Sequence, residues 1–421
     1  MMKKICALLC SVLFVTSGFA QDMDYTKQLV KKLSSDVFMG RGYVNKGDSI
    51  AAKYLSKEMK TIGLKGFSPN FYQSYSISIN TFPQTPKLYL NGKELRPAKD
   101  FIVSPSTTSC KEKVKVKWIS KNDLTNPWAL SGFMHKDHSK VFLAIDTTGL
   151  NNPELFHFAQ TMMQKNVFDA KGMLIIKEKL KFSARTETVD YPMFMLKSDV
   201  ISPDVKEISY EVKSQFIEDY KTQNLIAYIP GEVDSCIMYS AHYDHLGFMG
   251  NKMYPGANDN ASGVAMVLNL AKHFKSKKRK PHYTLVFALF SAEEAGLKGA
   301  TYYTENPLVP LEKTKMLFNF DMVGTGSEGL YLINGKEVPE ETKKLNAINE
   351  KNKYVFGMHA TGESSSSDHA PFHDKAVKTI FFYTEGDNAD YHETTDTADK
   401  LPYTQFEGIF KLIRDYTDLR N

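Results

Sequence analysis

The stretch from Ser240 to Gly263 constrains this chain more than any other, because it places metal-binding side chains at two structural boundaries. It follows the apolar run Cys236–Tyr239, which is typical of a buried β-strand. His242 and Asp244 stand where that strand would end, and Asp259 lies in a glycine-bounded turn that opens an amphipathic helix. An imidazole with one carboxylate behind it and a second carboxylate on a turn suits a divalent metal. The sequence therefore predicts a metal site here.

The second half of the chain alternates between strand and helix patterns. Strands are predicted at 225–229, 236–239, 284–290, 316–320, 329–333 and 379–383, and helices at 262–274, 296–304, 341–351 and 404–419. This alternation implies an α/β fold with a mainly parallel, doubly wound sheet flanked by helices.

The segment between about residues 84 and 212 has a different character. Short β-like runs alternate with polar loops, one helix is predicted near Glu154 to Gln164, and no metal-ligand spacing occurs. A chain of 421 residues is also longer than one hydrophobic core usually serves. We therefore predict an α/β domain formed by 21–83 and 213–421, with a small β-rich domain inserted at 84–212.

The first twenty residues have the pattern of a signal peptide. Lys3 and Lys4 precede an apolar run, and Gly18-Phe19-Ala20 fits a cleavage site. The run is shorter than the roughly 20 residues that span a bilayer, so we expect an exported protein, periplasmic or secreted, without a membrane span. The formal charge of +5 is small and partly in the leader, which argues against a nucleic-acid partner. Cys110 and Cys236, the cysteines beyond the leader, are expected to stay unpaired.

Four predicted strands are each followed closely by residues that can bind a metal. These residues are His242, the pair Glu293 and Glu294, Asp321, and the segment Asp390-Tyr391-His392. Since the carboxyl ends of parallel strands form the ligand crevice of an open sheet, we expect these side chains to converge. Three ligands and a water molecule would complete one zinc site. Five ligands would suit two metals about 3.5–4 Å apart, if one carboxylate bridges them.

The positions of the acidic residues suggest different roles. Asp259 is the natural bridge, because it lies between the two halves of the ligand set. Glu293 remains free beside Glu294 and is placed to act as a general base toward a water molecule. Asp244 is expected to support the metal ligand His242 and orient its ring.

Other polar residues near these motifs are expected to have structural roles. We expect His245 to point away from the metal, either as a loop residue or as a support for a ligand. The serine run Ser364–Ser367 is expected to be a mobile loop rather than a source of a nucleophile. His369 is expected to position the wall of the site. Asp368 is expected to pair with a substrate amine or with a buried histidine.

Taken together, these motifs resemble the di-zinc exopeptidase family of secreted bacterial aminopeptidases, which also includes glutaminyl cyclases and transferrin-receptor-like proteins. The resemblance is carried by 241–247, 256–263, 291–297, 319–322, 367–372 and Tyr391-His392. It extends from about Asn224 to the last residue of the sequence. The segment 84–212 is weakly similar to the protease-associated insert of some members.

The resemblance implies a two-zinc aminopeptidase that acts on the N-termini of peptides. One zinc ion would be held by His242, Asp259 and Asp321, and the other by Asp259, Glu294 and His392. By the same resemblance, Glu293 would serve as base and later as acid, and Tyr391 would donate a hydrogen bond to the oxyanion of the tetrahedral intermediate.

Two other functions are compatible with parts of this pattern. A glutaminyl cyclase, which forms N-terminal pyroglutamate, has a related site, but that family typically uses one zinc ion and lacks the insert. A non-catalytic protein that binds partners through the insert would not need the full ligand set. The sequence does not specify the preferred N-terminal residue or the oligomeric state.

Overall fold

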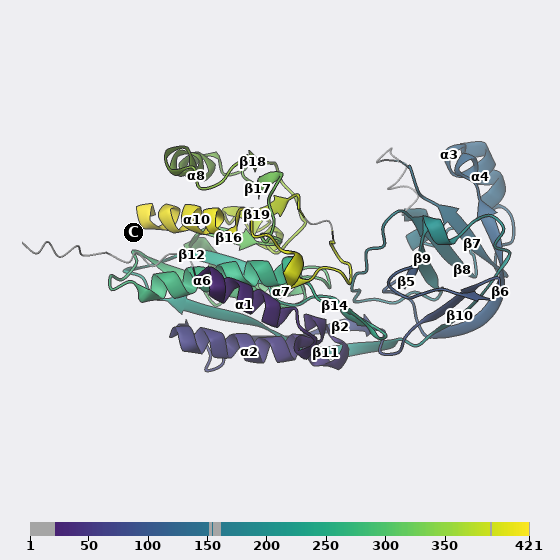
Figure 1. Cartoon of the computed structure of the whole chain (residues 1–421), viewed down its shortest axis with the longest axis horizontal. Coiled ribbons are helices and arrows are strands. Elements are labelled where there is room, and N and C mark those ends of the chain that lie inside the picture. Colours follow the sequence, from purple (N-terminus) through teal and green to yellow (C-terminus); the bar gives the residue numbers. More distant parts are fainter. Residues whose placement is uncertain (1–21, 151–153, 155–160, 388–389, 421) are drawn as a thin grey trace, which may run out of the picture.

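The computed structural model describes residues 22–150, 154, 161–387 and 390–420. The predicted signal peptide, and most of the helix predicted near Glu154 to Gln164, lie outside these residues. Two sheets organise the described chain, one in each of two lobes (Figure 1). In the described part of the chain, no helix combines the length and apolar character needed to cross a bilayer.

The larger sheet contains the strands predicted in the second half of the chain. Its order is β1 (Lys65–Gly66), β11 (Gln215–Ile229), β15 (Tyr283–Phe290), β12 (Val233–His242), β16 (Thr314–Phe320), β19 (Thr379–Glu385), β17 (Gly329–Ile333) and β18 (Met358–Ala360), with β2 (Tyr72–Thr81) paired to β11. The central strands β15, β12, β16 and β19 are parallel, whereas β11 and β17 run antiparallel to their central neighbours. The α/β fold is therefore confirmed, with a parallel centre and antiparallel strands on either side.

Helices cover both faces of this sheet, as the continuous apolar strands require. Alternate residues of β12 divide between the faces: Ile237 and Tyr239 join one core cluster, Cys236 and Met238 another. The first cluster includes residues of α1 (Met23–Leu33), α2 (Gly47–Ile62), α6 (Gly263–Ser276), α8 (Pro339–Asn352) and α10 (Phe406–Arg420). The second includes residues of α7 (Lys298–Glu305) and α9 (Ala370–His373).

The register of the central strands determines where the site forms. His242 pairs with Phe290 across β12 and β15, and Ser240 pairs with Asn319 across β12 and β16. The residues that follow β15 and β16 therefore emerge at the same edge of the sheet as His242. This is the edge at which the sequence predicts a metal site.

The second sheet consists of strands that all lie between residues 87 and 212. Its order is β4 (Lys93–Glu94), β3 (Lys87–Leu90), β10 (Glu207–Val212), β6 (Cys110–Ile119), β7 (Val141–Asp146), β8 (Gly172–Lys177), β9 (Met193–Lys197) and β5 (Phe101–Val103). The short helices α3 (Lys121–Thr125) and α4 (Pro127–Met134) contribute Leu124, Leu130 and Phe133 to the core on one face. We call this part of the molecule, residues 84–212, the insert lobe.

The two lobes are joined by a ribbon and by an apolar contact. Strands β2 and β11 pair with each other and run from the larger sheet toward the insert lobe (Figure 1). The apolar contact is made around the hairpin of β13 (Gly247–Met249) and β14 (Lys252–Tyr254). Its residues Leu246, Met249 and Tyr254 belong to the same core cluster as residues of the second sheet.

The remaining short helical segments are η1 (Asp36–Arg41), η2 (Val44–Lys46), η3 (Ser198–Val200), η4 (Ala257–Ser262), η5 (Leu311–Lys313) and η6 (Ala398–Lys400). Cys110 and Cys236 are free thiols.

Candidate metal centre and active site

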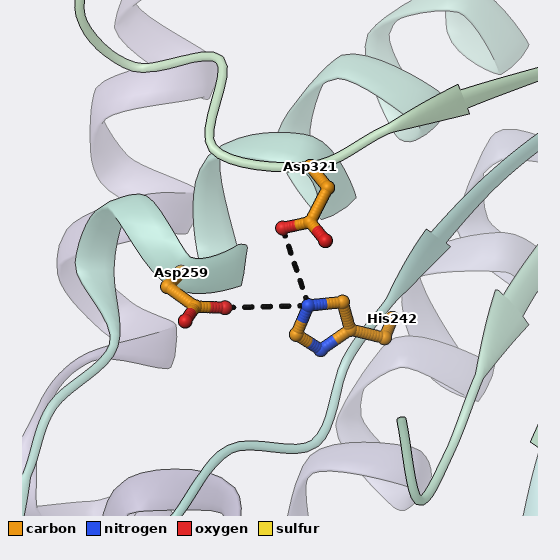
Figure 2. A group of neighbouring side chains, drawn as sticks. All are labelled: His242, Asp259 and Asp321. Carbon is orange, nitrogen blue, oxygen red and sulfur yellow. Dashed lines mark hydrogen bonds and ion pairs between the residues drawn. The ribbon is translucent and has the colours of Figure 1, made fainter. Parts of the chain in front are cut away.

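The first group of predicted ligands converges on the imidazole of His242, at the end of β12. Its Nε2 lies 3.2 Å from Asp259 Oδ1 and 3.3 Å from Asp321 Oδ1 (Figure 2). Its Nδ1 donates to the backbone carbonyl of Asp244 at 3.1 Å. That bond fixes the ring so that Nε2 faces both carboxylates, as is usual for a histidine that binds a metal.

The second group converges on His392 in the same way. Its Nε2 lies 3.2 Å from Asp259 Oδ2 and 3.0 Å from Glu294 Oε2. Its Nδ1 donates to the carbonyl of Phe182, in the insert lobe, at 2.7 Å. The two oxygens of Asp259 thus face two different imidazoles, which is the arrangement expected of a bridging carboxylate.

The prediction that His245 points away from the site is wrong. Its buried ring directs Nδ1 to within 2.6 Å of Glu294 Oε1 and 4.0 Å of Asp259 Oδ1. The backbone N–H of His245 donates to the carbonyl of Arg41, so the chain after β12 is held in a course that places the ring beside the cluster. His245, Asp259 and Glu294 offer an alternative set of three ligand atoms.

Glu293 lies beside the first group without bonding to it. Its Oε2 is 3.9 Å from His242 Nε2, and its side chain is 13% exposed. Burial, reinforced by the negative charges of Glu294 and Asp321, raises the pKa of Glu293 well above its ordinary value, although His242 opposes the shift. Bound cations would lower this pKa.

Burial and the neighbouring charges within the cluster shift the pKa values of its side chains. Burial opposes ionisation of Asp259, but hydrogen bonds from His242 and His392 outweigh it and hold the pKa of Asp259 well below its usual range. Glu294 is also buried, yet His392 and His245 lower its pKa to about 2. Burial disfavours the charged form of His242, but Asp321 and its other acidic neighbours raise the pKa well above the ordinary value.

This donor set fits divalent cations. The cluster contains the carboxylates of Asp259, Glu293, Glu294 and Asp321 and three imidazoles, and all seven side chains are buried or nearly so. Nitrogen and carboxylate donors of this kind are those that zinc accepts. Several buried carboxylates this close together need compensating positive charge. A metal ion supplies that charge at neutral pH without requiring the imidazoles to be protonated.

Asp244 supports the cluster differently from the prediction. Its carboxylate Oδ1 is 3.8 Å from His242 Nδ1, and the backbone carbonyl of Asp244, rather than the side chain, accepts the bond from the ring. The carboxylate instead accepts from the backbone N–H groups of Glu293 at 3.1 Å and Glu294 at 3.4 Å, and from the hydroxyl of Tyr43 at 3.0 Å. Asp244 therefore anchors the loop that carries both glutamates.

The serine run supplies a buried support rather than only a loop. Ser367 is fully buried, and its hydroxyl donates to Asp321 Oδ2 at 2.7 Å. The next residue, Asp368, is also fully buried, and neither of its oxygens has a hydrogen-bond partner among the described residues. It therefore does not pair with a histidine by a hydrogen bond. His369 is buried and packs on Phe381, which lines the cavity, with ring centroids 5.1 Å apart.

Arg41 is a supporting residue that the sequence analysis did not identify. Its guanidinium is fully buried and donates to the carbonyls of Gly256 at 2.6 Å and Asp259 at 3.2 Å. It also donates to the carbonyls of Leu33, Tyr243 and Pro255. Burial lowers the pKa of Arg41 to about 10, while Asp259 and other carboxylates favour its charged form. The pattern Gly40-Arg41-Gly42 was the only signal in the sequence, and it resembles an ordinary turn.

Asp396 and Gly256 complete the support of η4. The carboxylate of Asp396 accepts from the backbone N–H groups of Asn258 at 2.9 Å and Asp259 at 3.1 Å. Gly256 has φ +61°, and a Cβ there would lie 2.2 Å from the carbonyl oxygen of Asp259 and 2.6 Å from Arg41 Nη2. The close approach of Arg41 therefore requires glycine at this position.

A cavity of about 550 Å³ opens above the cluster. Its floor includes His242, Asp259, Glu293 and Asp321, and its walls include Met322, Ile333, Phe381, Tyr383 and Tyr391. The ring of Tyr391 stacks on that of His392, with centroids 3.8 Å apart, and the side chain is 37% exposed. Burial and the nearby carboxylates raise the pKa of Tyr391 above its ordinary value, so its hydroxyl stays protonated at neutral pH.

Comparison with known proteins agrees with this geometry. The sequence model of peptidase family M28 matches residues 224–417, a segment that contains all the predicted metal ligands. This segment is therefore similar to members of peptidase family M28. The chain is similar to aminopeptidase YwaD of Bacillus subtilis, with 30% identity over 186 residues (42% of this chain, 39% of the relative). It is also similar to leupeptin-inactivating enzyme 1 of Streptomyces exfoliatus, with 32% identity over 185 residues (42% and 38%). These alignments span about two-fifths of each curated relative.

Solved structures extend the likeness in fold to nearly the whole chain. An aminopeptidase from Aneurinibacillus sp. strain AM-1 has a TM-score of 0.68 at 19% identity, covering 94% of this chain and 93% of its own. A zinc aminopeptidase from Bacillus subtilis gives a TM-score of 0.68 at 19% identity, with 93% of each chain covered. The chain thus shares its overall fold with these proteins.

Proposed function

We propose that this protein is an exported, zinc-dependent aminopeptidase that removes residues from the N-termini of peptides. The observation that carries the proposal is the placement of two imidazoles, His242 and His392, on the two oxygens of Asp259, with Glu293 beside them. Several similar proteins are aminopeptidases, one of them described as a zinc aminopeptidase, and this supports the same activity. The signal-peptide pattern of residues 1–20 supports export.

The residues present would hold two zinc ions in overlapping sites: His242, Asp259 and Asp321 for one, and Asp259, Glu294 and His392 for the other. When bound, zinc supplies Lewis acidity that polarises a carbonyl and lowers the pKa of water. The carbonyls of Asp244 and Phe182 keep both histidine Nε2 atoms directed at the cluster.

The remaining chemistry belongs to the side chains of the cavity. Glu293, at the floor, is placed to accept a proton from the attacking water and to deliver it to the leaving amine. The protonated hydroxyl of Tyr391, in the wall, would donate to the oxyanion as the carbonyl carbon becomes tetrahedral. The apolar wall formed by Met322, Ile333 and Phe381 would favour substrates with an apolar first residue.

The test uses zinc-loaded protein beginning at Gln21 and a mixture of peptides, some of which start with glutamine. Products are read by mass spectrometry with and without a chelator. Chelator-sensitive loss of whole N-terminal residues is the expected result. Loss of only ammonia from the glutamine peptides would indicate a glutaminyl cyclase, and no product at all would favour a binding protein.

The variant Glu293→Gln tests the role of the base. It keeps the shape of the side chain but cannot accept the proton, so kcat should fall by at least about 100-fold with zinc content unchanged. Glu350→Gln, at an exposed position of α8, is the matched control and should retain full activity. A Glu293→Gln protein with wild-type kcat would remove Glu293 from the mechanism.

A further inference from the structure

The insert lobe contributes one cation to the wall of the active-site cavity. Lys181, from the loop after β8, lines the same cavity as His242, Glu293 and Tyr391. Its Nζ lies 4.9 Å from the centroid of the Tyr391 ring. Among the described residues that line this cavity, Lys181 is the single lysine or arginine. The cavity therefore has an anionic floor and a cation at its wall.

The backbone around Lys181 is held on both sides. Leu180 and Phe182 are buried in the core cluster shared by the two lobes, and Phe182 stacks on Tyr254 with ring centroids 5.0 Å apart. Ala184 is buried in a separate cluster that contains Tyr43 and residues of β2. The carbonyl of Phe182 is also the acceptor for His392 Nδ1. Packing therefore fixes the backbone position of Lys181, while its exposed side chain stays free to reorient.

The ammonium group of Lys181 lies over an aromatic ring rather than beside a carboxylate. No carboxylate of the described residues lies within 4.0 Å of its Nζ, and its neighbour is the face of the Tyr391 ring. An exposed cation over an aromatic ring gains only about 0.5–1 kcal/mol from that contact. The group can therefore turn to an anionic ligand at small cost.

The order of the side chains along the cavity suits the end of a short peptide. Lys181 stands over Tyr391, and the Tyr391 ring stacks 3.8 Å from that of His392, so the three side chains form a series from the cavity wall to the metal ligands. An extended residue spans about 3.3–3.6 Å. A peptide whose scissile carbonyl lies at the cluster would bring a carboxylate one or two residues further along to the region of Lys181.

We propose that Lys181 binds the terminal carboxylate of di- and tripeptides, so that the enzyme prefers short peptides with a free C-terminus. This inference rests on the proposed aminopeptidase function. It assigns a substrate-binding role to the insert lobe, for which the sequence alone indicated no chemistry.

The test compares a dipeptide such as Leu-Gly with its C-terminal amide in the zinc-loaded enzyme. Lys181→Met retains most of the side-chain volume without the charge. It should raise KM for the dipeptide about tenfold, the loss expected for one charge-assisted bond. The kcat for the dipeptide and KM for the amide should change less than about twofold. Lys181→Arg should restore the preference, and Lys179→Met, which removes the same charge two residues earlier, should leave both substrates unchanged.

The contrary outcomes are separable. A wild-type enzyme that hydrolyses both substrates with the same KM, and a Lys181→Met variant that matches it, would overturn the carboxylate role and leave the aminopeptidase function intact. An equal loss on both substrates would show that Lys181 acts by supporting Tyr391, and would also overturn the inference. A wild-type protein that hydrolyses neither substrate would overturn the proposed function and this inference with it.

Discussion

At the scale of single residues, two imidazoles compete for the second metal position. His392 contacts Asp259 and Glu294 through Nε2, while its Nδ1 is fixed by the carbonyl of Phe182. His245 contacts Glu294 more closely, at 2.6 Å, but its distance of 4.0 Å from Asp259 is long and its Nε2 has no hydrogen-bond partner among the described residues. His392 matches the geometry of His242 at the first position. We therefore propose His392 as the ligand and His245 as the support of Glu294.

Zinc analysis of two variants distinguishes these roles. His392→Ala removes a direct ligand and should reduce the zinc content from two ions to one per chain. His245→Ala should retain both ions in excess zinc, but weaken the affinity for one of them by about 10–100-fold, as expected when a residue that orients a ligand is lost. The measurement is elemental analysis after dialysis at defined free zinc. The opposite pattern would exchange the two assignments.

At the scale of elements, the turn η4 carries the bridging carboxylate and is held mainly by groups distant in sequence. Arg41 donates to carbonyls before and within the turn, and Asp396 accepts from its first N–H groups. Gly256 provides the space for Arg41. The position of Asp259 therefore depends on residues near both ends of the chain.

Replacement of Arg41 should disrupt this turn. Arg41→Met leaves several buried carbonyls without donors, and each charge-assisted bond is worth about 1.5–3 kcal/mol. We expect the free energy of unfolding to fall by about 3 kcal/mol or more, with loss of bound zinc. Urea denaturation and zinc analysis provide the measurements. Arg279→Met, at an exposed position after α6, is the control. An Arg41→Met protein with normal stability and zinc content would show that η4 holds its shape without the guanidinium.

At the scale of the whole molecule, the lobes meet at the active site and at the β2–β11 ribbon. Helix α2 contacts that ribbon through Asp48. The buried carboxylate of Asp48 accepts hydrogen bonds from the hydroxyl groups of Tyr220 and, at 3.0 Å, Thr222, both in β11. Burial raises the pKa of Asp48 to about 6 despite these bonds. The protonation state of this buried carboxyl group therefore affects the contact between α2 and the ribbon, and with it the free energy of unfolding.

The raised pKa makes stability depend on pH in a defined direction. The folded state binds the proton of Asp48 more tightly than the unfolded state, in which the carboxyl has its ordinary pKa of about 3.8. Ionisation of Asp48 therefore costs stability as pH rises from about 4 to about 6, and the cost persists above that range. It is absent below about pH 4, where both states are protonated.

The variant Asp48→Asn should remove this dependence. The free energy of unfolding of the variant minus that of the wild type should increase by about 2 kcal/mol from pH 4 to pH 7. Urea denaturation of both proteins in chelator gives the measurement without a contribution from zinc release. Asp204→Asn, at an exposed position, is the control. A constant difference across this range would contradict the assignment to Asp48.

Much of the site could be predicted because its chemistry is local in sequence. His242 and Asp321 follow their strands directly, and strand pairing brings them to one edge. Arg41, Asp396 and Lys181 could not be found in this way, since each reaches the site from a segment without a strand-end or ligand pattern. The direction of the His245 ring was predicted wrongly because the course of the loop after β12 depends on a backbone hydrogen bond to the carbonyl of Arg41.

The sequence by itself determined the α/β fold, the strands and helices of the larger sheet, and the residue types of the metal cluster. These follow from apolar periodicity and from side chains placed at strand ends, which are properties of neighbouring residues. Only the tertiary structure decided the antiparallel flanks of the sheet, the choice between His392 and His245, and the entry of Lys181 into the cavity wall. Those features depend on contacts between residues far apart in the chain, and no local pattern encodes the packing that brings them together.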